Sequence, residues 1–172
     1  MGFREAMDFV LVNEGGYSND RDDVGGETNY GIASNYNKGA DVKKLTESDA
    51  VDIYRRDYWE PYRADDMPHD VGAKYFDVLV NAGPRDAGRV LQKAINRAGG
   101  KVGIDGIVGS RTVGALYDLD EDEILNAMVL EQKNMYYDKI KKRPKNSKYL
   151  KGWMRRAEKK PSTGKRSKHA GT

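Results

Sequence analysis

Glu14 is the residue with the clearest catalytic potential, because it places a carboxylate on the apolar face of a predicted helix. Phe3, Met7 and Val10 fall about one helical turn apart, and the same period continued by four residues reaches Glu14. A leucine would be expected at that position. The alternative is that the apolar face ends at Leu11 and that Glu14 is an ordinary polar residue at the end of the helix.

The residues that follow Glu14 predict that it lies in the last helical turn. Gly15 and Gly16 come next, and glycine readily adopts the left-handed conformation that ends a helix. Apolar neighbours and the negative end of the helix dipole both disfavour ionisation of a carboxyl group there. A carboxyl group that keeps its proton near neutral pH can act as a general acid.

A carboxylate-rich loop follows this helix. Residues 19–27 are dense in Asp, Asn and Gly, and residues 28–32 are compatible with a β-strand. The pattern predicts a small hairpin that holds acidic and hydroxyl groups over the end of the helix, with Asp23 nine residues after Glu14. A carboxylic acid on a helix that faces a second carboxylate is the arrangement used to cleave glycosidic bonds.

This stretch resembles glycoside hydrolase family 108, whose members are N-acetylmuramidases with a lysozyme-like fold, found in phage endolysins and related bacterial proteins. The similar residues are Glu14-Gly-Gly-Tyr and Asp23-x-Gly-Gly-x-Thr28-Asn-x-Gly-Ile. The resemblance implies that Glu14 is the catalytic acid and Asp23 its partner. Thr28 is one residue short of the spacing of the Glu, Asp, Thr triad of classical phage lysozymes, and Asn29 occupies the expected place. The competitors for the second role are Asp20, Asp22 and Glu27.

The resemblance continues in order to about residue 157. Its further markers are Ile53-Tyr-Arg-x-x-Tyr-Trp59, Phe76-Asp-x-x-Val-Asn-x-Gly83, Leu91-Gln-x-Ala94, Asp105-Gly-x-x-Gly-x-x-Thr112 and Gly152-Trp-x-x-Arg156. The last three are similar to a C-terminal peptidoglycan-binding-like region. The resemblance implies a lysozyme-like catalytic region at 1–85 and a helical peptidoglycan-binding-like region at 86–157 packed on it.

Local patterns predict a mainly α fold with one small β-hairpin after the first helix. Thr46 begins a capping-box-like helix that runs until Pro61, and a second helix spans 71–82. Asp86 is a candidate cap for a third helix that ends at Gly99, and Asp120 caps the longest helix, which Pro144 breaks. Short helices are expected from residue 110 and around residue 153.

Length and composition fit a small soluble enzyme. The 172 residues suit one compact domain or a domain with a subdomain, and there is no cysteine. No apolar run is long enough to span a membrane, and no Sec signal is visible. We therefore expect a monomer that is made in the cytoplasm of a bacterial host and acts on the cell wall after release.

Charge is unevenly distributed along the chain. Residues 1–138 hold 16 Lys and Arg against 26 Asp and Glu, whereas residues 139–172 hold 14 against one. The segment from 158 to 172 lacks apolar periodicity and is expected to be a disordered basic tail. Such a tail would attract an anionic envelope surface. The alternative is a solubilising tail, or one that folds back on the acidic body.

Several other residues invite a functional interpretation. Tyr17 and Tyr30 flank the motif and are candidate contacts for sugar faces, and Asn81 is a candidate for either helix capping or lining the cleft. Asp20-x-Asp22 weakly resembles a calcium loop, but Val24 and Gly31 stand where ligands should be. We expect no metal and no cofactor.

The sequence therefore predicts a muramidase that cleaves the β-1,4 bond between N-acetylmuramic acid and N-acetylglucosamine. Glu14 would protonate the leaving oxygen, and Asp23 would stabilise the oxocarbenium-like centre or position water with Thr28 or Asn29. If the hairpin carboxylates point away from Glu14, a single-acid lytic transglycosylase fits better. A non-catalytic cell-wall-binding module is the third reading, and residues 91–112 would suit it.

Overall fold

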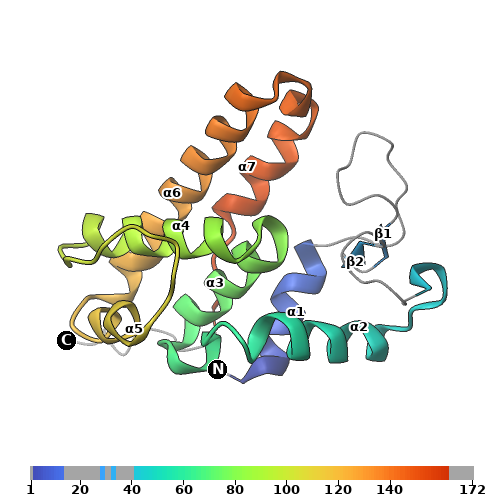
Figure 1. Ribbon diagram of the computed structural model, residues 1–172, viewed down its shortest axis with the longest axis horizontal. Coiled ribbons are helices and arrows are strands. Elements are labelled where there is room, and N and C mark those ends of the chain that lie inside the picture. The colour runs from blue at the N-terminus through green and yellow to red at the C-terminus, as the bar shows by residue number, and fades with distance from the viewer. Residues whose placement is uncertain (1, 14–27, 30–31, 34–40, 163–172) are drawn as a thin grey trace, which may run out of the picture.

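The computed structural model describes residues 2–13, 28–29, 32–33 and 41–162, and this part of the chain is mainly helical (Figure 1). The α-helices are α1 (Phe3–Asn13), α2 (Glu47–Tyr54), α3 (His69–Ala82), α4 (Pro84–Arg97), α5 (Ser110–Leu116), α6 (Glu121–Lys142) and α7 (Leu150–Glu158). Shorter turns are the 3₁₀ helices η1 (Val42–Lys44), η3 (Ala64–Asp66) and η4 (Pro144–Tyr149), and the π-helix η2 (Arg55–Trp59). The prediction of a mainly α class is confirmed.

The described β structure consists of two short strands. Strands β1 (Thr28–Asn29) and β2 (Ile32–Ala33) pair antiparallel, with Thr28 opposite Ala33 and Asn29 opposite Ile32. The other residues of the expected hairpin lie outside the described residues, so the hairpin after the first helix stays a proposal.

Two of the predicted helix starts are confirmed by side-chain caps. The Thr46 hydroxyl accepts a hydrogen bond from the backbone N–H of Asp49, and the Asp49 carboxylate accepts one from the N–H of Thr46. This is a complete capping box. At α6 the Asp120 carboxylate accepts from the N–H of Glu123, and the helix ends at Lys142, before the expected break at Pro144.

Two other starts differ from the prediction. Helix α3 begins at His69 rather than at residue 71, because the Glu121 carboxylate of α6 accepts from the backbone N–H groups of Asp70 and Val71. Helix α4 begins at Pro84, where the missing N–H of proline costs no hydrogen bond. Asp86 is therefore not the cap; it lies in the first turn of α4 and pairs with α6.

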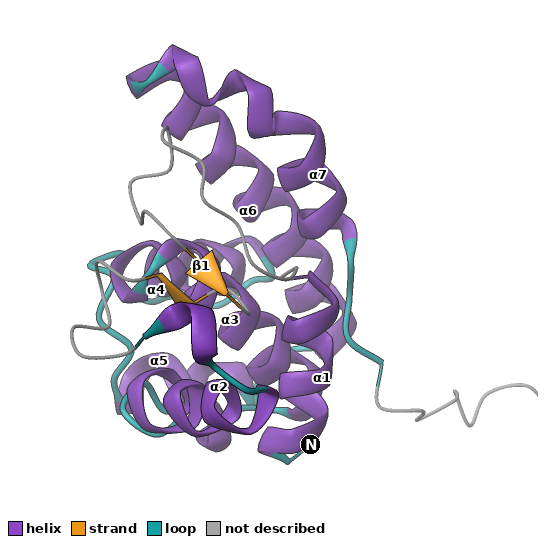
Figure 2. Ribbon diagram, turned by 90° about the vertical axis from the view of Figure 1, so that its right-hand side faces the viewer, coloured by secondary structure: helices purple, strands orange, loops and turns teal. Residues whose placement is uncertain are grey.

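Helix α3 is the central element of the packing. It contacts α1, α4 and α6, and nine of its residues are buried. Helices α6 and α7 lie side by side and extend beyond the other helices in both views (Figures 1 and 2). Among the described residues, no helix is long and apolar enough to cross a membrane.

The expected start of the tail is wrong. Glu158 is the last residue of α7, the carbonyl oxygen of Lys159 accepts a hydrogen bond from Lys74, and Pro161 is buried. Contacts of Glu158, Lys159 and Lys160 and the burial of Pro161 therefore hold residues 158–161 on the body of the protein. The remainder of the expected tail, 163–172, lies outside the described residues.

Candidate active site

The predicted site residues divide into three groups. Glu14, Tyr17, Asp23 and Tyr30 lie outside the described residues. The backbones of Thr28 and Asn29 form β1, and Asn81 lies in the last turn of α3. The geometry closest to the candidate acid is therefore that of α1 up to Asn13, the residue directly before Glu14.

Aromatic packing holds the first turn of α1. The ring centroid of Phe3 lies 5.5 Å from that of Trp59 and 6.0 Å from that of Phe76. The ring centroids of Trp59 and Phe76 lie 5.3 Å apart, and these two rings meet edge to face. Further along the same helix Met7 and Val10 are buried, as the apolar period predicts. The start and middle of α1 are thereby fixed against α3 and the π-helix.

A buried ion pair holds the last turn of α1. The Asn13 side-chain amide donates to the Asp77 carboxylate at 3.0 Å. Arg156 of α7 donates to both oxygens of the same carboxylate, at 2.9 and 3.2 Å. Asp77 is fully buried and the Arg156 side chain is 11% exposed. The residue next to Glu14 is thus tied to α3 and, through Asp77, to α7.

Lys74, one helical turn before Asp77, holds the end of α7. This fully buried ammonium donates to the carbonyl oxygens of Ala157 and Lys159 at 2.8 and 2.7 Å, and more weakly to that of Arg156 at 3.4 Å. The last carbonyls of a helix lack partners within the helix, so these bonds cap α7. Burial lowers the pKa of Lys74 to about 8, and the charge of Asp77 partly offsets that effect.

Asn81 has a structural contact that the sequence does not predict. Its side-chain oxygen accepts a hydrogen bond of 2.6 Å from the Tyr136 hydroxyl, and the Tyr136 ring stacks on Trp153 at 4.8 Å. Asn81 does not cap α3, whose final bond runs from the Gly83 N–H to the Leu79 carbonyl. The capping interpretation of Asn81 is therefore wrong.

The sequence markers meet one another in space. The segment from 76 to 83 contributes Asp77 and Asn81, and the segment from 152 to 156 contributes Trp153 and Arg156, and these residues join through the contacts above. The markers at 91–94 and 105–112 also meet, through buried Gln92, whose side chain bonds to Asp105 and is within 3.4 Å of Thr112. The sequence located these segments but gave no reason for their pairing.

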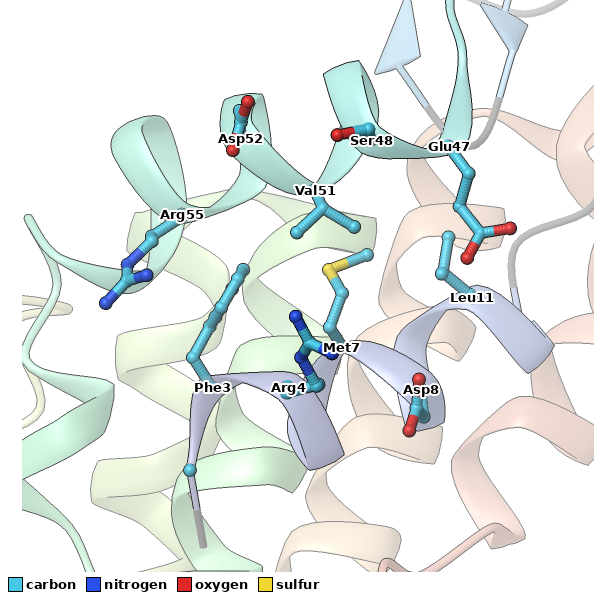
Figure 3. Close-up of a pocket in the computed structure, with 11 residues that line it drawn as sticks. Phe3, Arg4, Met7, Asp8, Leu11, Glu47, Ser48, Val51, Asp52 and Arg55 are labelled. Atoms are coloured by element: carbon cyan, nitrogen blue, oxygen red, sulfur yellow. The ribbon is translucent and has the colours of Figure 1, made fainter.

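A groove of about 790 Å³ runs between α1 and α2 (Figure 3). Phe3, Met7 and Leu11 of α1 face Val51 of α2, and charged side chains of both helices stand around them. Asn81 does not line it. Within the described parts of the chain, no three His, Cys, Asp or Glu side chains gather closely enough to hold a metal ion.

Comparison with known proteins identifies two segments. A family model described as glycosyl hydrolase 108 matches residues 7–83, and one described as a predicted peptidoglycan domain matches residues 86–158. Among solved structures the chain is similar to SagA of Brucella abortus, with 33% identity and a TM-score of 0.74 over 90% of this chain and 88% of that one. A search of the curated proteins finds no match.

Proposed function

The chain belongs to the glycosyl hydrolase 108 family, and we propose that it is an endolysin-type muramidase in which Glu14 is the general acid. Membership makes it a glycoside hydrolase that acts on peptidoglycan. The proposal adds the bond, which is the β-1,4 linkage between N-acetylmuramic acid and N-acetylglucosamine, and the proton donor. It also adds a lysozyme-like arrangement, with a hairpin built on β1 and β2 after α1.

The observation that carries the role of Glu14 is the anchoring of α1 at both of its ends. A general acid works only within hydrogen-bond reach of the oxygen that it protonates. Phe3 at the first turn is packed against Trp59 and Phe76, and Asn13 at the last turn is bonded to Asp77. Glu14 follows Asn13 directly in the sequence. Anchoring Asn13 lowers the entropic cost of positioning the Glu14 carboxylic acid.

The second catalytic group in this proposal is Asp23, with Thr28 or Asn29 assisting. Asp23 stabilises the oxocarbenium-like transition state, and a separation from Glu14 of about 5–5.5 Å would favour retention, against about 6.5–9.5 Å for inversion. Tyr17 and Tyr30 contact sugar faces. Asn81 contributes its amide nitrogen to substrate, because its oxygen already accepts from Tyr136.

We also propose a division of the chain between α3 and α4. The catalytic region is 1–85 and the peptidoglycan-binding-like region is 86–157, which the two family matches at 7–83 and 86–158 support. The regions share buried polar contacts, since Lys74 and Asp77 of the first bind Ala157 and Arg156 of the second. These contacts support a second region that is packed on the first.

The reducing ends of digested peptidoglycan test the bond assignment. We expect N-acetylmuramic acid at the new reducing ends, measured by borohydride reduction and mass spectrometry of the fragments. N-acetylglucosamine ends would contradict the muramidase assignment, and anhydro-muramic ends would identify a lytic transglycosylase. Tight binding to the wall with no released fragments would favour the non-catalytic module.

For the basic C-terminal segment we propose attraction to anionic envelope surfaces. A chain that ends at residue 162 keeps Lys159 and Pro161, and so keeps the cap of α7. We expect it to lose more activity on whole cells at low salt than on purified wall, because exposed charges are screened at high salt. Replacing Lys165, Arg166 and Lys168 with Gln should have the same effect. Equal loss on both substrates would mean that the segment serves the fold.

A further inference from the structure

A second groove lies between α4 and α6, in the region that matches the predicted peptidoglycan domain. Its volume is about 370 Å³. Arg85, Arg89 and Lys93 line it from α4 at intervals of four residues, so they lie along one side of that helix. Lys142, in the last turn of α6, lines the other wall.

Of the three carboxylates that line this groove, two are paired with other cations, and only Asp138 is left to offset these four. Asp86 lines the same groove but pairs with Lys139 at 2.8 Å. Glu131 also lines it but pairs with Arg97 at 2.7 Å. Over the described part of the chain, no hydrogen-bond or ion-pair partner is found for the side chains of Arg85, Arg89, Lys93 and Lys142. Like charges four residues apart destabilise a helix, so this row is unfavourable for α4 unless an anion binds it.

The loop beside α4 restricts the two arginines. Buried Gln92 accepts hydrogen bonds from the backbone N–H groups of Asp105 and Gly106, at 3.0 and 2.8 Å. Gly106 has a φ of +80°, and a Cβ there would lie 3.0 Å from the Arg85 Cγ and 3.3 Å from the Arg89 Cγ. The loop therefore packs directly against the aliphatic parts of both arginines. Restricting them beforehand lowers the entropy lost when an anion binds.

We propose that this groove binds the carboxylates of the peptide stems of peptidoglycan. Arginine pairs with carboxylates through two parallel hydrogen bonds, so neighbouring arginines suit a chain that carries several carboxylates. Asp138, which is exposed, lines the groove and has no described partner, would accept the amino group of a diamino acid in the stem. The inference rests on peptidoglycan as the substrate, and it assigns the peptide rather than the glycan to this groove.

The test is calorimetric binding of a muramyl tetrapeptide to the full chain and to the variant Arg85→Gln/Arg89→Gln/Lys93→Gln. We expect the triple substitution to raise the Kd at least about tenfold, since it removes charge-assisted hydrogen bonds. Lys101→Gln/Arg111→Gln/Arg155→Gln is the matched control, because it removes the same charge from exposed cations outside the groove. That control should change the Kd less than about twofold.

A tetrapeptide with amidated carboxylates should bind the unsubstituted chain at least about tenfold more weakly than the free acid. Equal binding of the two peptides, or of the triple variant and the unsubstituted chain, would overturn the proposal. If the triple variant loses binding to anionic phospholipid vesicles but not to the tetrapeptide, the groove recognises phosphate and the proposal fails. Because this binding needs no glycan cleavage, its failure is distinguishable from failure of the muramidase assignment.

Discussion

Glu14→Gln is expected to lower the rate of glycan cleavage by a factor of about 10²–10⁴, the usual contribution of a general acid. Glutamine keeps the size of the side chain but cannot deliver a proton to the leaving oxygen. Turbidity clearance of peptidoglycan and the release of reducing ends measure the rate. Sedimentation with the wall should be unchanged, because the groove between α4 and α6 and the basic C-terminal segment remain intact.

The carboxylates of the following loop supply the controls. Asp23→Asn should approach the effect of Glu14→Gln, whereas Asp20→Asn and Asp22→Asn should retain most activity. Wild-type clearance by Glu14→Gln would remove that residue from the mechanism. A large effect at Asp20 or Asp22, with none at Asp23, would transfer the second role to that residue and leave the first unchanged.

Arg156→Met should lower the free energy of unfolding by about 3–5 kcal/mol, because it removes the guanidinium that donates to both oxygens of the buried Asp77 carboxylate. The total stability of a domain is about 5–15 kcal/mol, so this loss is a large part of it. Urea denaturation followed by circular dichroism measures it. Arg155→Met, the exposed neighbour on α7, should change stability by less than about 1 kcal/mol.

A double variant separates the buried charge from simple loss of packing. Asp77→Asn/Arg156→Met removes both charges and still offers Asn13 an acceptor, so it should be more stable than Arg156→Met alone. An Arg156→Met protein as stable as Arg155→Met would mean that the pair contributes little. If Arg156→Met folds but cleaves glycan more slowly, the contact between Asp77 and Asn13 positions the end of α1.

Local sequence patterns predicted the features that depend on neighbouring residues. The capping box at Thr46, the cap at Asp120 and the end of the longest helix before Pro144 are all confirmed. Each depends on side chains within a few positions of the helix end. The buried face of α1 at Met7 and Val10 is confirmed for the same reason.

The features that the sequence did not predict depend on residues far apart in the chain. Helix α3 starts early because Glu121, about fifty residues away, supplies its first acceptor. Lys74 and Asp77 are charged residue types that are rarely fully buried unless paired, and their partners on α7 and α1 explain their burial. The tail was expected to begin at 158 because its composition is polar, yet Lys159 is held by its backbone carbonyl, which composition does not describe.

The cap that Lys74 places on α7 limits how this protein could be recombined. The lysine belongs to the segment 7–83, and the carbonyls of Arg156 and Ala157 that it satisfies belong to the segment 86–158. A C-terminal region grafted onto another hydrolase would leave the end of α7 without its donor, and Arg156 without its carboxylate. We therefore expect a stable chimera to carry α3 together with α7, so the two segments should be exchanged as a pair and not singly.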